Sequence, residues 1–170
     1  NKLFVGIKYG VDGQHVAMSI ATKVDEKIFV ESIDCQSVRN GNTWIISFLK
    51  EADIEKVVID GSGSQQILSD EIKDYGIKLK PVLPKVSDVV VANNMFEQAV
   101  TSSKNICHND QPSLKQIITN CKRRAIGTNG GFGFKAMMEE HEIALLDSVI
   151  LAHWACATYK GVKKKQKISC

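Results

Sequence analysis

The sequence predicts one α/β domain built on a mixed β-sheet, antiparallel where it begins and parallel later. Three observations support this prediction. The chain has 170 residues, which suits one ordinary domain. Its 44% hydrophobic and 24% charged residues exclude a disordered or fibrous protein. The hydrophobic pattern also changes after the first third, from successive short strands to strands that alternate with helices.

The first third predicts an antiparallel meander. Residues 3–7, 16–21 and 28–33 are short, largely apolar runs, separated by turns near residues 12–13 and 25–27. The first turn contains Asp12-Gly13, a dipeptide favoured in tight hairpins. Three strands joined by short turns pair in sequence order.

The next part predicts a βαβ unit. Apolar residues recur at helical spacing over residues 43–52, and the short apolar run at residues 57–59 reads as a strand. A helix over residues 64–75 and a strand near residues 77–82 follow. A strand, a helix and a strand of these lengths favour parallel pairing.

The last part is expected to be mainly helical. Helices are predicted over residues 87–100, 113–123 and 146–159, with a hairpin across residues 124–134. The domain is expected to span residues 1–160, followed by a basic tail at residues 161–170. No apolar run reaches the roughly 18 residues needed to span a bilayer. The five scattered cysteines have no zinc-finger spacing, so free thiols in a reducing compartment are expected.

Asp60 is the strongest chemical signal. It ends the apolar strand and precedes Gly61-Ser62-Gly63, so its carboxylate should emerge at the carboxyl edge of the sheet, where open α/β sheets bind ligands. The alternative is that Asp60 caps the following helix.

Asp147 is the second signal, because it is the one acid within the apolar run at residues 144–152. Burying a lone carboxylate is costly unless it is paired or binds a metal. The alternative is that Asp147 begins the last helix as its N-cap. If Asp60 and Asp147 converge, a divalent cation would offset their repulsion, and Mg²⁺ favours one or two protein carboxylates.

The basic run Lys122-Arg123-Arg124 has two interpretations. It can be a solvated helix end, or it can contact phosphates beside the glycine-rich segment that follows.

Taken together, the sequence resembles the C-terminal nuclease domain of tailed-phage terminase large subunits, over nearly the whole chain. The stretches that carry the resemblance are VGIK at 5–8, VVIDG at 57–61, HNDQPSL at 108–114, Asn120 with KRR at 122–124, GGFGF at 130–134 and LDSVILA at 146–152. The resemblance implies a ribonuclease H-like fold with helices on both faces of the sheet. It also implies DNA cleavage with Mg²⁺ or Mn²⁺ held by acids, of which Asp60 and Asp147 match the second and third positions.

At the first acidic position of that family this chain has Lys8. A protonated lysine cannot ligate a cation. Three explanations are open: Asp12 or Glu31 supplies the missing carboxylate, the Lys8 ammonium replaces one cation and contacts the scissile phosphate, or the domain grips DNA without cutting it. The second is favoured, because Lys8 occupies the metal-facing position of the first strand.

The resemblance therefore predicts a metal-dependent DNA endonuclease that cuts concatemeric viral DNA during genome packaging in the host cytoplasm. The expected catalytic residues are Asp60, Asp147 and Lys8. The expected metal ligands are Asp60, Asp147 and Asp12. The expected contacts to double-stranded DNA are Lys122, Arg123, Arg124 and Lys135. The implied partners are an ATPase motor domain of the same polypeptide, the portal and the small terminase subunit, with no membrane. The alternatives are a non-catalytic DNA-binding module and a junction resolvase-like nuclease.

Overall fold

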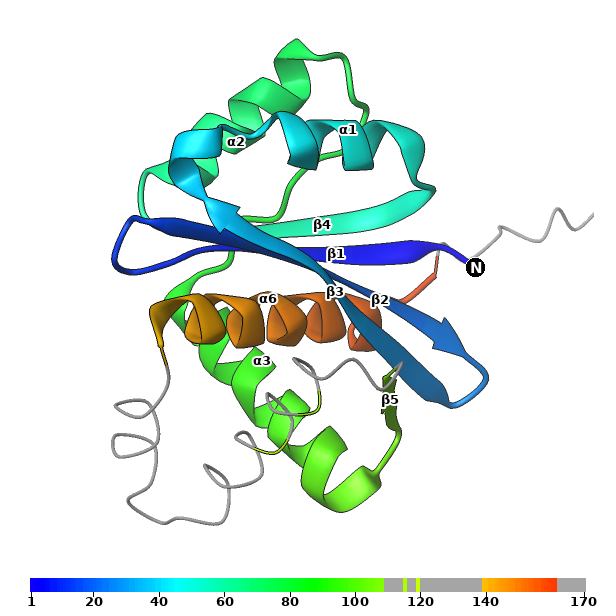
Figure 1. Cartoon of the computed structure of the whole chain (residues 1–170). Coiled ribbons are helices and arrows are strands. Elements are labelled where there is room, and N and C mark those ends of the chain that lie inside the picture. The colour runs from blue at the N-terminus through cyan, green and yellow to red at the C-terminus, as the bar shows by residue number, and fades with distance from the viewer. Residues whose placement is uncertain (109–114, 116–118, 120–138, 162–170) are drawn as a thin grey trace, which may run out of the picture.

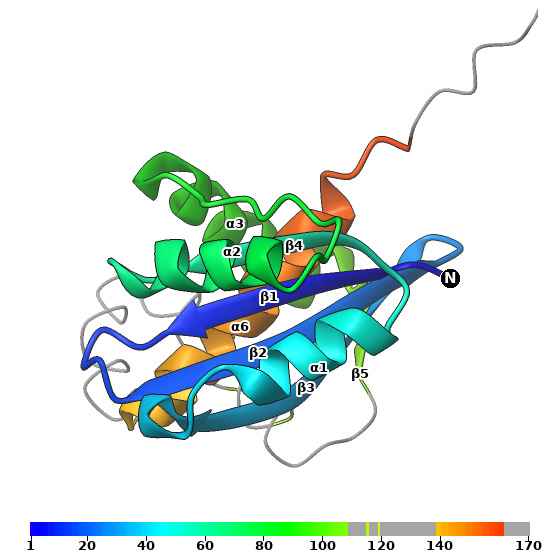
Figure 2. The same cartoon turned by 90° about the horizontal axis from the view of Figure 1, so that it is seen from above.

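The computed structural model describes residues 1–108, 115, 119 and 139–161 (Figure 1). Within them a five-stranded mixed sheet has helices on both faces, as the sequence predicts (Figures 1 and 2). The strands are β1 (Leu3–Tyr9), β2 (His15–Val24), β3 (Lys27–Ser37), β4 (Ile54–Asp60) and β5 (Ile106–His108). The helices are α1 (Thr43–Glu51), α2 (Ser64–Asp74), α3 (Val86–Gln98) and α6 (Glu140–Ala157), with a 3-10 turn at Val38–Asn40 and a π-helical turn at Ala99–Ser103.

The strand order is β4-β1-β2-β3-β5. Strands β1, β2 and β3 pair antiparallel, whereas β4 pairs parallel with β1 and β5 pairs parallel with β3. An antiparallel meander whose first strand takes a parallel neighbour is the ribonuclease H-like arrangement that the resemblance implies.

The sheet separates two apolar cores. Helices α1 and α2 cover one face, where Val5, Ile7 and Ile59 are fully buried. Helices α3 and α6 cover the other face, where Phe96 and Val149 are fully buried (Figure 2). Successive side chains of a strand point to opposite faces, so the even-numbered residues of β1 face α6.

Helix α6 lies directly on β1 at Gly6. A Cβ atom at this position would overlap the Ser148 carbonyl oxygen and lie 2.5 Å from the Ala152 amide nitrogen. Beside this contact the buried Ser19 and Ser148 hydroxyls hydrogen-bond at 2.7 Å. The absence of a side chain at Gly6 therefore sets how closely the helix approaches the sheet.

Part of the predicted secondary structure is corrected. The strand expected near residues 77–82 reduces to one parallel bridge between Val58 and Val82. The amide of Val82 donates to the Val57 carbonyl, but Pro81 and Pro84 on either side have no N–H to donate. Ile77 and Leu79 pack against the core below α1 and α2 instead.

The last helix begins at Glu140, six residues before the expected start at residue 146. Strand β5 was not expected. The predicted helix at 113–123, apart from residues 115 and 119, and the predicted hairpin at 124–134 and tail beyond residue 161 lie outside the described residues.

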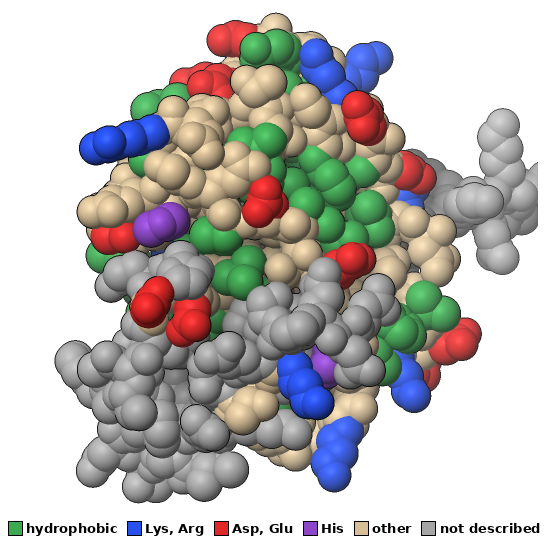
Figure 3. Space-filling view, in the orientation of Figure 1, with side chains coloured by type: hydrophobic (Ala, Val, Ile, Leu, Met, Phe, Trp, Pro, Cys, Tyr) green, Lys and Arg blue, Asp and Glu red, His purple; other side chains and the backbone are tan. Residues whose placement is uncertain are grey.

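The described part of the chain contains no helix long and apolar enough to cross a membrane. Its three cysteines, Cys35, Cys107 and Cys156, are free thiols. In the orientation of Figure 1, the space-filling view shows apolar side chains gathered near α1 and the neighbouring strands (Figure 3).

Candidate active site

The centre of the candidate site is an ion pair between Lys8 and Asp60. The two residues are register partners on the parallel strands β1 and β4, near the carboxyl end of each strand. Lys8 Nζ lies 2.6 Å from Asp60 Oδ2, and the two side chains are only 14% and 20% exposed. The pair lies at the edge where parallel strands of α/β sheets present their ligand-binding groups.

Local sequence explains why these two side chains meet. The apolar run at residues 57–59 buries β4 on both faces. Val58 belongs to the core under α6, so Asp60, two residues further on, points to that same side. Phe4 of β1 also belongs to this core, and alternation places Lys8 on its face.

Asp60 does not cap a helix. The N-cap of α2 is Gly63, with no side-chain cap hydrogen bond. Gly61, which follows Asp60, has φ 141° and leaves no room for a Cβ, since one would lie 2.5 Å from Tyr9 Cβ. Glycine at this position therefore lets the chain turn sharply after the strand.

Asp147 lies in the interior of α6, so it is not an N-cap either. The helix begins at Glu140, and its capping box is formed by Glu139 and Glu142. Asp147 directly precedes Ser148, whose carbonyl covers Gly6. It also lies one turn before Leu151, whose Cβ faces Gly6 as well.

The direction of α6 places Asp147 at the same end of the sheet as Lys8. The Tyr159 ring packs 5.2 Å from the Phe4 ring, so the end of α6 lies over the beginning of β1 and the two run in opposite directions. Asp147 precedes Leu151 by one helical turn, which is about 5.4 Å along the helix axis. This is close to the distance between Gly6, which Leu151 faces, and Lys8 along β1. Asp147 therefore lies towards the same end of the sheet as the Lys8–Asp60 pair, and it is not among the residues that line the pocket beside that pair.

A pocket of about 220 Å³ opens beside the ion pair. The loop after β1, the 3-10 turn after β3 and the beginning of α2 complete its wall. Its lining residues are Lys8, Tyr9, Gly10, Val11, Gly13, Val38, Asp60, Gly61, Ser62 and Ser64.

Asp12 has a local structural role in its turn. Its Oδ1 accepts from the Gln14 amide at 3.0 Å, and its Oδ2 lies 3.4 Å from His15 Nδ1. The Gln14 hydrogen bond, with a smaller contribution from His15, lowers the pKa of the Asp12 carboxyl. Asp12 does not line the Lys8–Asp60 pocket.

Glu31 is on the wrong face of the sheet to replace the missing carboxylate. Its neighbours Ile28 and Val30 belong to the core under α6, and alternation turns Glu31 to the opposite side. Of the two residues that the sequence offers for the missing carboxylate, Glu31 is therefore the one that faces away from the site. The expected DNA contacts Lys122, Arg123, Arg124 and Lys135 lie outside the described residues.

The donor set suits one hard divalent ion better than two. The described residues contain no group of three or more His, Cys, Asp or Glu side chains that could hold a metal. Asp60 and Asp147 are the two carboxylates that would bind such an ion, and Mg²⁺ takes one or two protein carboxylates, with water and substrate oxygens for the rest. The Lys8 ammonium already places one positive charge against Asp60 Oδ2, which disfavours a second cation there.

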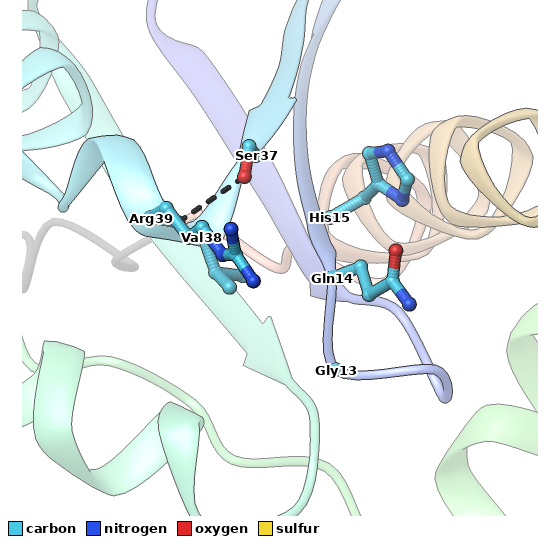
Figure 4. A pocket seen from close by; sticks show the side chains of 6 residues that line it. All are labelled: Gly13, Gln14, His15, Ser37, Val38 and Arg39. Atoms are coloured by element: carbon cyan, nitrogen blue, oxygen red, sulfur yellow. Dashed lines mark hydrogen bonds between the residues drawn. The ribbon is translucent and has the colours of Figure 1, made fainter.

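A second pocket, of about 400 Å³, was not anticipated from the sequence (Figure 4). It is lined by Gly13, Gln14, His15, Ser37, Val38 and Arg39. No motif marks these residues. The sequence signal that could have marked this pocket is Arg39, a single basic residue shortly after a strand.

Comparisons with known proteins point to one group of solved structures. The chain is similar to the large terminase of a thermophilic bacteriophage, with 16% identity and a TM-score of 0.45 over 69% of this chain and 31% of that one. It is also similar to the large terminase nuclease domain of bacteriophage SPP1, solved with bound Mn, with 12% identity and a TM-score of 0.43 over 71% of this chain and 68% of that one.

This likeness is one of fold. The chain spans less than a third of the large terminase from the thermophilic bacteriophage. No protein-family model and no curated protein matches the sequence.

Proposed function

We propose that this chain is a nuclease domain that hydrolyses phosphodiester bonds of double-stranded DNA during viral genome packaging. The observation that supports the proposal is the Lys8–Asp60 ion pair, held in a pocket at the carboxyl edge of the sheet, with Asp147 on the helix that covers the same face. A nuclease needs groups that bind a phosphate and groups that bind a cation, and this arrangement supplies both chemistries.

In the proposed site Asp60 and Asp147 hold one Mg²⁺ or Mn²⁺ ion. When bound, such an ion polarises a phosphoryl oxygen and lowers the pKa of a coordinated water. Lys8 contributes a fixed positive charge beside the phosphate, where negative charge grows in the transition state. The low exposure of both partners strengthens this electrostatic effect relative to that of a pair in open solvent.

The wider role is part of the same proposal. Lys122, Arg123, Arg124 and Lys135 would contact the duplex through its phosphates, so that cleavage depends little on base sequence. An ATPase motor domain of the same polypeptide, the portal and the small terminase subunit would be the partners in the host cytoplasm.

Supercoiled-plasmid nicking tests the proposal. Wild type is expected to nick with Mn²⁺ or Mg²⁺ and not with EDTA. Asp60→Asn and Asp147→Asn are expected to reduce the rate by about a hundredfold or more, the scale of losing a main electrostatic group in a hydrolytic site. Asp74→Asn, at the exposed end of α2, is the matched control and should cut like wild type. Folded wild type that gives no metal-dependent nicking contradicts the proposal.

One observation favours a second candidate, a non-catalytic DNA-binding module. Asp60 Oδ2 is already engaged by Lys8 at 2.6 Å, so a metal has to share this carboxylate with an ammonium. The variant Lys8→Gln separates the two functions. If Lys8 assists cleavage, its loss slows nicking. If Lys8 blocks the site, wild type is inactive and Lys8→Gln gains metal-dependent nicking.

A further inference from the structure

The second pocket adjoins the candidate active site. The two pockets share Gly13 of the β1–β2 turn and Val38 of the 3-10 turn that directly follows β3. The Val38 amide donates to the Gln14 carbonyl at 2.9 Å, so the shared wall is tied together by a backbone hydrogen bond. The pocket of Arg39 and the pocket of Lys8 and Asp60 therefore lie next to each other, on either side of this shared wall.

Arg39 is the charged group of this second pocket. Its backbone position is fixed, because the Arg39 amide donates to Ser37 Oγ and the residue belongs to the 3-10 turn Val38–Asn40. Among the described residues no carboxylate forms an ion pair with its guanidinium. An exposed arginine in a pocket, with its five N–H donors uncommitted to an acid, is suited to a phosphate.

The opposite wall is polar and carries no acid. Figure 4 shows Arg39 and Val38 on one side of the pocket and Gln14 and His15 on the other. The nearby carboxylate of Asp12 is turned to the Gln14 amide and to His15 Nδ1. In the adjoining pocket beside Lys8 and Asp60, the first turn of α2 has no acidic residue, and Ser62 and Ser64 add hydroxyl donors.

We propose that the pocket of Gly13, Gln14, His15, Ser37, Val38 and Arg39 binds a backbone phosphate of the same nucleic-acid strand that reaches Lys8 and Asp60, with Arg39 as the phosphate ligand. The part of this inference that places the strand at Lys8 and Asp60 rests on the proposed function. A small anion would fill one pocket only, whereas an extended polyanion occupies both pockets across their shared wall. Arg39 thus sets the course of the strand past the active site.

The test measures DNA binding without cleavage. Fluorescence anisotropy with a labelled DNA duplex, in EDTA and from 50 to about 200 mM KCl, gives the dissociation constant and its salt dependence. Arg39→Gln is expected to weaken binding several-fold and to reduce the slope of log K against log salt by about one. Arg39→Lys should retain the slope, because the charge remains.

Lys27→Gln is the matched control. Lys27 is exposed at the start of β3, beside the β2–β3 turn and so at the opposite end of the sheet, and its loss changes the net charge by the same amount. It should leave the slope unchanged. A slope for Arg39→Gln equal to that of wild type, or an equal loss in Lys27→Gln, overturns the Arg39 site.

The two proposals fail in different ways. Normal DNA binding by Arg39→Gln, together with metal-dependent nicking by wild type, removes the Arg39 site and leaves the nuclease. A lower salt slope in Arg39→Gln, together with no nicking by wild type, removes the nuclease and leaves the binding path. Thermal unfolding of each variant, monitored by circular dichroism, confirms that the exposed substitutions keep the fold.

Discussion

The two faces of the sheet are built differently. The face under α1 and α2 is mainly apolar, and the buried Tyr9 hydroxyl on it donates to Asn42 Oδ1 at 2.8 Å. The face under α6 contains a glycine contact, a buried serine pair, a buried histidine and the Lys8–Asp60 ion pair. Apolar packing stabilises the face under α1 and α2. On the face under α6, polar side chains occupy part of the buried surface.

This difference separates scaffold from site. A residue of the α1–α2 face should affect stability without affecting chemistry. A residue of the α6 face near Gly6 should affect both, because α6 carries Asp147 and lies directly on the strand that carries Lys8. Substitutions on each face therefore test the division.

The largest effect is expected for Ile7→Ala on the scaffold face. Ile7 is fully buried, and its truncation should lower the free energy of unfolding by about 2–5 kcal/mol, through lost burial and the cavity left behind. Urea denaturation measures the loss. Ile67→Ala, at an exposed isoleucine of α2, should change stability by less than about 0.5 kcal/mol. Plasmid nicking per folded molecule should stay at the wild-type rate; a large fall would contradict the division between the faces.

The next effect concerns pH and His153. Burial lowers the pKa of this imidazole to about 4, and its ring packs 5.4 Å from Phe96 in an edge-to-face contact. Because the unfolded chain binds the proton more readily, stability should fall as the pH drops from about 6.5 towards 4, by at most about 3 kcal/mol. His153→Leu removes this component. Urea denaturation at several pH values checks it, and parallel stability–pH curves for wild type and variant would count against a buried neutral histidine.

The smallest effect is expected for Gly6→Ala, yet it is the most informative about coupling. The added methyl group overlaps the α6 backbone, so the helix has to shift, at a cost of about 1–3 kcal/mol. Gly161→Ala, which has no close contact, is the control. Because the shift moves Asp147 relative to Lys8, nicking by the folded variant should also slow. A stability loss with an unchanged nicking rate would place Asp147 outside the reacting centre.

The sequence was informative where structure is local. The meander was predicted because its hydrophobic runs and turns lie next to one another in the chain, and α1, α2 and α3 were each predicted from the pattern within one segment. The strand expected near residues 77–82 was wrong except at Val82, because alternating apolar residues there serve packing while Pro81 and Pro84 remove ladder donors.

The sequence by itself determined the mixed sheet, the position of Asp60 at a strand end and the unusual lysine at position 8. Only the tertiary structure decided that Lys8 and Asp60 form an ion pair, that Asp147 lies within a helix and that Glu31 faces away. It also joined Arg39 to Gln14 and His15 in one pocket. The physical reason is that strand order and register bring together residues far apart in the chain, and no periodicity within a single segment encodes those partners.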